Sequence, residues 1–443
     1  MLKITKFGGS SVANADQFRK VKEIVESDPA RKYVVVSAPG KRDKSDNKIT
    51  DLLYLLDAHR QYHVDGSNVY KLIRQRFVDI KNELGLKQPI EEELDQFYQN
   101  LNKYSQDAIV SRGEYFCAKL MAEYLGYDFV DAQDVIRFKM DKTIDMKRTT
   151  EKLLQKKAEH ERFVFPGFYG STATDQVQVF SRGGGDITGA ILARCLEADV
   201  YENWTDVSGF LMADPSIVQS PKPITHITYT ELRELSYMGA SVLHEEAIFP
   251  VKEANIPIHI LNTNHPEDAG TIIQEHTNIK NKYSITGIAG KRGFLSIYVY
   301  KKHMSNEVGF IRRVLTILES YNISVEHIPT GIDSFSIVVV ESDIRDSLYE
   351  ILARIKSELK PDEIHTDDDL ALISTVGKAM AEKSGMAGKL FGALGEHKIN
   401  IKMIAQSSDE INITVAVKAS DFKRSIRAIY DKFVTEEDLV DYE

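Results

Sequence analysis

The sequence predicts an α/β domain with a mainly parallel sheet over residues 1–280, followed by two ferredoxin-like α+β domains over 281–364 and 365–443. Two observations predict this fold. Short β-branched runs alternate with amphipathic helical stretches up to about residue 280, which is typical of a layered α/β structure. Behind them, a pattern of glycines and apolar residues recurs once at a fixed spacing, which indicates a duplicated unit. A chain of 443 residues has room for about three domains of roughly 150 residues each.

The composition is that of a globular protein, with 42% hydrophobic and 28% charged residues. The net charge is −10 and no long basic tract occurs, which argues against nucleic acid or an anionic membrane as the main partner. No apolar run approaches the roughly 20 residues that span a bilayer, and the N-terminus lacks the pattern of a signal peptide. The two cysteines, Cys117 and Cys195, lie in apolar helical stretches and are expected to be buried thiols. The sequence therefore predicts a cytoplasmic protein.

The first strand leads into a glycine-rich turn with a lysine beside it. Residues 2–5 alternate in polarity as a strand does, and residues 16–27 carry apolar side chains at helical spacing. Between them stands the segment Lys6-Phe7-Gly8-Gly9-Ser10-Ser11-Val12. A turn of this kind between a strand and a helix can present backbone N–H groups to a phosphate. The alternative is an ordinary strand-to-helix turn with one solvated lysine.

The segments that follow justify the parallel sheet. Residues 33–38 form a continuous valine-rich run, as expected for a strand that is buried on both faces. Further strands are predicted at 162–168, 176–180, 199–204 and 256–261, with helices at 50–58 and 110–125 between them. The polar, charged loop 41–48 follows the second strand. Loops at the carboxyl ends of strands are where ligands bind in such sheets.

The C-terminal third repeats with an offset of 76 residues. The segment 309–315 aligns with 385–391, the segment 322–328 aligns with 398–404, and Phe335, Ile337 and Val339 align with Ile411, Ile413 and Val415. Each copy reads strand, helix, strand, strand and helix, which is the ferredoxin-like β-α-β-β-α-β pattern. The strand at 283–291 either belongs to the first copy or packs into the second.

A second glycine-rich segment, Ser181-Arg182-Gly183-Gly184-Gly185-Asp186, opens a helix that is predicted over 186–196. Three consecutive glycines destabilise helix and strand alike, so a close approach of the backbone to a ligand is the expected reason for them. The Arg182 guanidinium suits a carboxylate, and Asp186 stands where a helix N-terminus favours negative charge. The alternative is a capping aspartate beside a surface arginine.

Three further segments could take part in binding or catalysis, but none of them identifies a particular function by itself. Glu114, in Ser111-Arg112-Gly113-Glu114, can bind a substrate ammonium or simply cap a helix. Thr205 and Asp206 follow a predicted strand and suit a nucleotide or Mg²⁺ contact, and His244 is expected to be structural. The sequence contains no G-x-G-x-x-G, P-loop, G-x-S-x-G or H-E-x-x-H motif, so dinucleotide binding and the common hydrolase sites are unsupported.

In this order, the segments resemble the amino-acid kinase superfamily and, within it, the aspartate kinases. The resemblance covers essentially the whole chain and rests on residues 6–12, 36–38, 112–114, 182–186, 205–207, 239–240, 242–244, 262–263 and 270–271. The C-terminal repeat resembles tandem ACT domains. The resemblance implies a three-layer kinase domain that phosphorylates the side-chain carboxylate of L-aspartate to 4-phospho-L-aspartate with ATP and Mg²⁺, at the start of lysine, threonine and methionine biosynthesis. A carboxylate is already ionised near neutral pH, which agrees with the absence of an obvious catalytic triad.

The resemblance also implies roles for particular residues. Lys6 and Asp186 would be catalytic. The ATP-binding residues would be Lys6, Gly8, Gly9, Ser10, Thr205 and Asp206. The aspartate-binding residues would be Ser37, Thr50, Glu114, Arg182, Gly183 and Gly184, with Glu114 on the ammonium and Arg182 on the α-carboxylate. No metal centre built from protein side chains is predicted.

The chain departs from the family pattern at several positions. Gly185 stands where many members have serine, Ser241 where many have lysine, and Ser216 where arginine is frequent. Glu245 and Glu246 stand where proline and a basic or small residue are commoner. Ser241 and Glu245 favour one alternative function, a catalytically weak amino-acid sensor that keeps the fold. The other alternative is a different carboxylate kinase of the same fold, acting on glutamate or acetylglutamate.

The tandem repeat resembles the regulatory part of lysine-inhibited aspartate kinases. By position, the effector pocket would contain Met304, Gly309, Phe310, Ile311, Glu326 and Thr330, with Asp333 added by proximity. Glu326 could pair with the side-chain ammonium of lysine, whereas Phe310 and Ile311 could equally be helix core. The expectation is end-product inhibition, with lysine as the effector, in a homodimer or higher homo-oligomer joined at its ACT domains.

Overall fold

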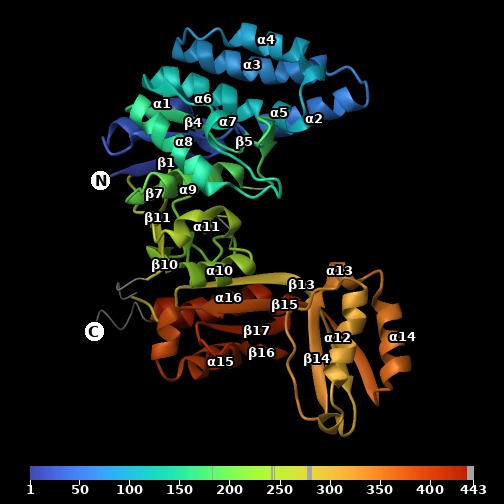
Figure 1. Cartoon of the computed structure of the whole chain (residues 1–443). Helices are drawn as coiled ribbons and strands as arrows, with labels where there is room; N and C mark the ends of the chain where they lie inside the picture. Colours follow the sequence, from blue (N-terminus) through green and yellow to red (C-terminus); the bar gives the residue numbers. More distant parts are fainter. Residues whose placement is uncertain (182, 241–242, 244, 277–281, 437–443) are drawn as a thin grey trace. The chain divides into compact units, whose positions relative to one another are not determined.

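The computed structural model describes residues 1–181, 183–240, 243, 245–276 and 282–436 (Figure 1). Its backbone contacts divide the chain into two units. The N-terminal unit consists of Met1–Phe210, Pro223–Tyr229 and Val242–Asn278. The C-terminal unit consists of Leu211–Lys222, Thr230–Ser241 and Ile279–Glu443. The domain limits near residues 280 and 364 that the sequence suggests stay predictions.

Within the described residues, an eight-stranded sheet forms the centre of the N-terminal unit. In spatial order its strands are β10 (His226–Thr228), β12 (Thr271–Gln274), β11 (Ile258–Asn262), β7 (Val200–Thr205), β1 (Lys3–Phe7), β2 (Tyr33–Val36), β4 (Phe163–Pro166) and β3 (Asp128–Phe129). Neighbouring strands run parallel, except that β11 and β12 are antiparallel. The mainly parallel sheet expected from the sequence is confirmed.

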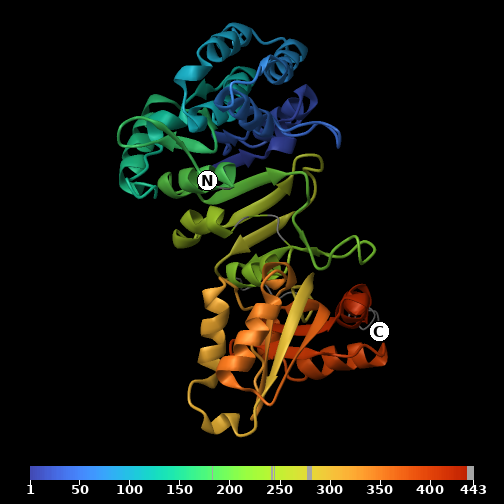
Figure 2. The ribbon, with the colours of Figure 1, turned by 90° about the vertical axis from the view of Figure 1, so that its right-hand side faces the viewer.

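Helices cover both faces of this sheet, which explains why β2 is buried along its whole length (Figures 1 and 2). On one face, α1 (Ala15–Glu26) and α6 (Arg112–Leu125) share a core with β1 and β2, and further helices pack outside them. These outer helices are α2 (Ile49–Gln61), α3 (Ser67–Leu84), α4 (Ile90–Gln99) and α5 (Gln106–Val110). The other face carries α9 (Gly184–Cys195), against which α8 (Met146–Glu159) and α11 (Glu245–Glu253) pack. The unit therefore has three layers.

One predicted strand lies outside the parallel sheet. The segment 176–180 contains β6 (Val177–Val179), which pairs antiparallel with β5 (Tyr169–Ser171) in a separate two-stranded ribbon. The connection between these strands is too short for the crossover that parallel pairing requires. A second ribbon consists of β8 (Phe210–Leu211) and β9 (Pro223–Ile224), and the short helix α7 (Ala132–Val135) packs against β5.

The two cysteines are free thiols and both are buried, as expected from the sequence. Burial raises the pKa of the Cys117 thiol and that of the Cys195 thiol. No helix among the described residues has both the length and the apolar character that crossing a lipid bilayer requires.

A buried ionic network ties β1 and β7 to the segment that precedes β2. Glu202 on β7 is 1% exposed, and its two oxygens accept hydrogen bonds from Arg31 at 2.8 and 3.2 Å. Lys3 Nζ lies 3.0 Å from Glu202 Oε1, and Trp204 Nε1 donates to Oε2 at 3.0 Å. Burial acts to raise the pKa of Glu202, but hydrogen bonding and charge from Arg31 outweigh it, so this pKa lies below its ordinary value. The carboxylate is therefore held ionised between two cations.

A five-stranded antiparallel sheet forms the centre of the C-terminal unit within the described residues. In spatial order its strands are β14 (Ser334–Val340), β13 (Gly287–Tyr300), β15 (Glu363–Val376), β17 (Asn412–Lys418) and β16 (Met403–Gln406). The helices of this unit are α12 (Phe310–Ser320), α13 (Glu341–Ile344), α14 (Leu348–Leu359), α15 (Met386–Glu396) and α16 (Phe422–Tyr430), together with most of α10 (Tyr229–Tyr237). The antiparallel α+β architecture expected from the sequence is confirmed.

Two long strands are shared by the two halves of this sheet. The part of β13 from Phe294 to Tyr300 pairs with β14, and it also pairs with the beginning of β15. The part of β13 from Gly287 to Arg292 pairs instead with residues 371–376 of β15, which in turn pair with β17. Each ferredoxin-like half therefore completes its sheet with a strand that continues into the other half.

The internal repeat is confirmed for the helices and corrected for one strand. Helices α12 and α15 begin and end 76 residues apart, and the glycines before them, Gly309 and Gly385, have φ angles of 78° and 85°. In the sheet, however, Ile297 pairs with Ile337, whereas the residue 76 positions later, Ile373, pairs with Val415. The predicted offset of 76 was therefore wrong for β14 and its counterpart β17, which are 78 residues apart. A shift of two residues keeps the same side chains facing inward, so hydrophobic alternation does not distinguish the two alignments.

The buried network makes a testable prediction for stability. Replacing Glu202 with alanine leaves Arg31 and Lys3 without their buried partner, so we expect the free energy of unfolding to fall by about 3 to 5 kcal/mol. Denaturant unfolding followed by circular dichroism measures this change. The control is Glu151→Ala on α8, where the side chain is exposed and the expected change is below about 0.5 kcal/mol. A loss below about 1 kcal/mol for Glu202→Ala would contradict the role assigned to the network.

Candidate active site

Three adjacent parallel strands end level with one another at one edge of the N-terminal sheet. Phe7, near the end of β1, is paired with Val36 on β2 and with Trp204 on β7. Beyond this level, the chain continues into the segments Gly8-Gly9, Ser37-Ala38 and Thr205-Asp206, which line a cavity of about 680 Å³. A cavity outside the carboxyl ends of parallel strands is the usual place for a ligand in an open α/β sheet.

The cavity brings together the predicted catalytic, ATP-binding and aspartate-binding residues that the structure describes. These are Lys6, Gly8, Gly9, Ser10, Ser37, Thr50, Glu114, Gly183, Gly184, Asp186, Thr205 and Asp206. Arg182, Ser241 and His244 lie outside the described residues, as do the side chains of Glu245 and Glu246. The two glycine-rich segments, far apart in the sequence, thus line one cavity, while the individual roles of these residues stay predictions.

A buried ion pair lies in the wall of the cavity. Lys6 Nζ, on β1, is 2.5 Å from Asp186 Oδ1 in the first turn of α9, and Lys6 is only 7% exposed. Asn203, on β7, contacts both groups: its Nδ2 donates to Asp186 Oδ1 at 2.8 Å, and its Oδ1 accepts from Lys6 Nζ at 3.4 Å. The helix N-terminus favours the Asp186 carboxylate at this place. The lysine ammonium is therefore held at the carboxyl end of β1.

The glycines of both segments have steric reasons. A Cβ atom on Gly185 would lie 2.7 Å from Ser37 Oγ and 3.3 Å from Lys6 Cε, so a side chain at this position would make a close contact. Gly183, directly before α9, has a φ of 58°, which lies in the left-handed region that glycine adopts readily. In the first segment, a Cβ atom on Gly9 would lie 2.9 Å from the Ala38 carbonyl oxygen. The backbones thus approach their neighbours too closely for side chains.

Glu114 is a buried carboxyl group that lines the cavity from the first turn of α6. It is 5% exposed, and its Oε2 atom finds no hydrogen-bond partner among the described residues. Burial raises the pKa of Glu114 to about 8, although hydrogen bonds from the backbone N–H groups of Ala38 and of Glu114 itself act in the opposite direction. A buried carboxyl group with a free oxygen is a suitable place for a cationic group of a ligand.

Several cavity residues were not predicted individually. Lys41 and Lys48 line the cavity, and the only signal for them was the charge of their loop at the end of the second strand. Phe168 and Asn203 also line it. Asn203 lies inside a buried strand, where a polar side chain is unusual, but nothing in the sequence tells which groups it contacts. Among the described residues, no cluster of three or more His, Cys, Asp or Glu side chains could hold a metal ion.

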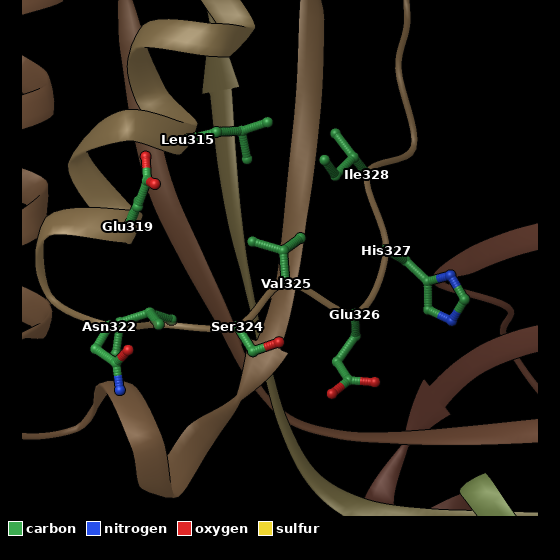
Figure 3. Close-up of a pocket in the computed structure, with 9 residues that line it drawn as sticks. Leu315, Glu319, Asn322, Ser324, Val325, Glu326, His327 and Ile328 are labelled. Carbon is green, nitrogen blue, oxygen red and sulfur yellow. The ribbon is translucent and has the colours of Figure 1, made fainter. Parts of the chain in front are cut away.

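A second hollow, of about 800 Å³, lies in the C-terminal unit. Figure 3 shows Leu315 and Glu319 on α12 and the extended segment 322–328 that follows this helix. Of the predicted effector residues, Glu326 lines the hollow, and its Oε2 accepts a hydrogen bond from the Tyr237 hydroxyl at 2.7 Å. Burial and this hydrogen bond raise the pKa of Tyr237 to about 12. Glu326 is therefore already partnered in this state of the protein.

The other predicted effector residues do not line this hollow. Met304 and Phe310 are buried in the core of the first ferredoxin-like half, and the Phe310 ring meets the Phe335 ring edge-on. Ile311 packs against the same core. Gly309 directly precedes α12, and Thr330 forms an isolated antiparallel β-bridge with Phe335. Phe310 and Ile311 thus have structural contacts that account for their apolar side chains.

Comparisons with known proteins agree with this arrangement. Residues 1–262 match the amino acid kinase family, and residues 373–433 match an ACT domain. The chain is 39% identical over 453 residues to aspartokinase 3 of Bacillus subtilis (strain 168), with 98% of both chains covered. The crystal structure of Clostridium acetobutylicum aspartate kinase, described as an allosteric enzyme, is 47% identical with a TM-score of 0.91 and covers 98% of this chain and 99% of that one.

A more distant solved structure is similar over the same length. Escherichia coli aspartokinase III, solved in complex with lysine and aspartate in the T-state, is 26% identical with a TM-score of 0.75. The match covers 98% of this chain and 99% of that one. The chain therefore belongs to the aspartokinases of the amino acid kinase family, with ACT domains behind the kinase domain, and it catalyses the ATP-dependent phosphorylation of the side-chain carboxylate of L-aspartate to 4-phospho-L-aspartate.

Proposed function

We propose that ATP and aspartate meet in the 680 Å³ cavity, with the Lys6 ammonium beside the phosphoryl group in transfer. The observation that carries this proposal is the Lys6–Asp186 ion pair in a cavity wall that also contains both glycine-rich segments. An oxygen of the aspartate side-chain carboxylate bonds to the γ-phosphorus while the bond from this phosphorus to the ADP oxygen breaks, so ADP leaves. The nucleophile is already ionised at neutral pH. The protein therefore has to position two anions and neutralise their charge.

In this proposal, the first glycine-rich segment and the end of β7 hold ATP. Backbone N–H groups of Gly8, Gly9 and Ser10 would face the phosphates, and Thr205 and Asp206 would face the nucleotide. Mg²⁺ bound to ATP supplies further positive charge toward the phosphates. The hard carboxylate oxygens that this ion prefers are present in the cavity on Asp206.

The aspartate molecule would bind between α6 and the beginning of α9. Glu114 would receive its ammonium, because the free Oε2 atom can accept a hydrogen bond and gain a counter-charge. Ser37, Thr50, Gly183 and Gly184 line the same cavity, and Arg182 would hold the α-carboxylate. The alternative of a catalytically weak sensor is not favoured, because the relatives that match the whole chain are aspartokinases.

The role of Lys6 is tested by Lys6→Met. Loss of a preorganised positive charge beside the phosphoryl group should lower kcat by about 100-fold to 1,000-fold. A coupled assay of ADP release measures this, with aspartate and glutamate compared as substrates of the parent enzyme. The control is Lys32→Met, just before β2, whose side chain is 39% exposed; it should keep the parent rate. Retention of more than a tenth of kcat in Lys6→Met would argue against the assignment.

The role of Glu114 makes a prediction for pH dependence. Since its pKa is raised to about 8, Glu114 is mostly protonated below that pH in the free enzyme, and binding of an ammonium requires the ionised form. We therefore expect KM for aspartate to rise as the pH falls from 8.5 to 6.5, approaching tenfold per unit at the acidic end. Glu114→Gln should show a high KM that no longer varies over this range. A KM that is flat with pH in the parent enzyme would rule out this role.

We further propose that lysine is the feedback effector and that it acts through the ACT domains of a homodimer. The support is the resemblance to Escherichia coli aspartokinase III, whose structure contains lysine and aspartate. Glu326 is an acidic residue at the edge of the C-terminal hollow. A lysine ammonium that pairs with Glu326 would compete with the Tyr237 hydroxyl for the same carboxylate. A cytoplasmic location, expected from the sequence, also stays a prediction.

Glu326→Gln tests the effector assignment. Because a charge-assisted hydrogen bond would be replaced by a neutral one, the lysine concentration for half inhibition should rise about tenfold, while kcat without lysine stays unchanged. Enzyme inhibition and isothermal titration with lysine measure the two quantities. Glu358→Gln on α14, a half-exposed glutamate paired with Arg354, is the control. The assignment would be rejected if the parent bound no lysine, or if both variants responded to lysine equally.

A further inference from the structure

Asn203 is the one side chain of the described cavity wall that is hydrogen-bonded to both members of the Lys6–Asp186 pair. It is 2% exposed, so its amide has little access to bulk water. The amide is complementary to an ion pair, because its N–H group donates to the carboxylate while its oxygen accepts from the ammonium. The opposite orientation would place the NH₂ group against the ammonium. The three side chains therefore form a closed triangle of contacts.

The same strand also holds the backbone of Asp186. Tyr201 and Asn203 are two positions apart on β7 and therefore point to the same face of the sheet. The Tyr201 hydroxyl donates to the Asp186 carbonyl oxygen at 3.1 Å, while Asn203 donates to the side-chain carboxylate. A Cβ atom on Gly189 would lie 2.5 Å from the Tyr201 ring, so α9 rests directly on this ring. Strand β7 thus fixes the beginning of α9 through both the main chain and the side chain of Asp186.

An ion pair alone would leave the direction of the ammonium open. Lysine carries a compact point charge on a flexible stem, with three donors that rotate together. A carboxylate acceptor on one side and an amide acceptor on another fix two of these donors. The third donor then remains for a negatively charged group in the cavity. For phosphoryl transfer, where rate depends on placing charge accurately, such a fixed direction is an advantage.

We propose that Asn203 is a positioning residue for phosphoryl transfer, which keeps the Lys6 ammonium and the Asp186 carboxylate in their working arrangement. This inference rests on the proposed role of Lys6. Asn203 acts through Lys6 and Asp186, so its loss should affect the chemical step more than the binding of either substrate.

Two substitutions separate the contributions of the amide. Asn203→Leu removes both hydrogen bonds and keeps a side chain of similar volume. Asn203→Asp keeps an acceptor for Lys6 but places a second carboxylate against Asp186. We expect kcat to fall about tenfold or more in both variants at pH 8, with KM for aspartate and ATP within about twofold of the parent. Thr5→Val is the control, since it removes a buried hydroxyl on the neighbouring strand β1 whose one hydrogen bond among the described residues goes to the Tyr33 carbonyl. Its kcat should be unchanged.

The pH profile distinguishes positioning from a general loss of structure. When the new carboxyl group in Asn203→Asp is protonated, its O–H can donate to Asp186 as the amide does. The Asp186 carboxylate, 2.8 Å from the amide nitrogen that the new group replaces, favours this protonated form. The Lys6 ammonium acts in the opposite direction from the longer distance of 3.4 Å. The kcat of Asn203→Asp relative to the parent should therefore rise as the pH falls from 8 to 6. The same ratio for Asn203→Leu should stay flat.

Several outcomes would overturn the inference. The first is an unchanged kcat in folded Asn203→Leu and Asn203→Asp. The second is an equal loss of kcat in both variants, with a ratio to the parent kcat that does not change with pH, which indicates a structural role alone. If neither of these variants is folded by circular dichroism, the kcat of Asn203→Ser, a smaller polar substitution, is measured instead and has to be lower than that of the parent. If Lys6→Met stays active, the proposed role of Lys6 fails together with this inference. An inactive Lys6→Met beside fully active Asn203 variants rejects the inference alone.

Discussion

The parallel register of β1 with β2 and β7 is the constraint on which the N-terminal unit depends. Because Phe7 is level with both Val36 and Trp204, the three strands end at the same edge of the sheet, and the segments that follow them lie next to one another there. Helices on both faces bury the strands, so polar backbone segments can leave the sheet only at its ends. The cavity is therefore a consequence of strand pairing, and the glycines allow the segments around it to approach one another.

Strand β7 takes part in the packing of the sheet and in the cavity wall through successive residues. Side chains alternate between the two faces of a strand, so Glu202 and its neighbour Asn203 point in opposite directions. On one face, Glu202 binds Arg31 and Lys3 in a buried network. On the other face, Asn203 contacts Lys6 and Asp186 beside the cavity. The residue of the buried network and the residue that contacts the ion pair in the cavity wall are thus adjacent in the sequence, which ties the geometry of the cavity to the packing of the sheet.

Sequence patterns predicted the parallel sheet, the two glycine-rich segments and the duplicated C-terminal part, because each depends on local spacing. The valine-rich run of β2 and the helix that begins within Gly183-Gly184-Gly185 are examples. Pairing between distant segments was not predictable in the same way. The ribbon partner of β6 and the two-residue shift between Ile337 and Val415 follow from long-range pairing that hydrophobic alternation does not encode. Asn203 was not predicted for the same reason, because the two side chains that it contacts come from other elements.

The long strands β13 and β15 have a consequence for how the C-terminal unit can change in evolution. Each strand supplies backbone partners to both ferredoxin-like halves, so cutting the chain between the halves would remove one strand from each half of the sheet. The bared edges would present unpaired N–H and C=O groups, a surface that favours aggregation. Neither half therefore has a complete sheet on its own. The two halves have to be inherited, lost or transferred to another protein together.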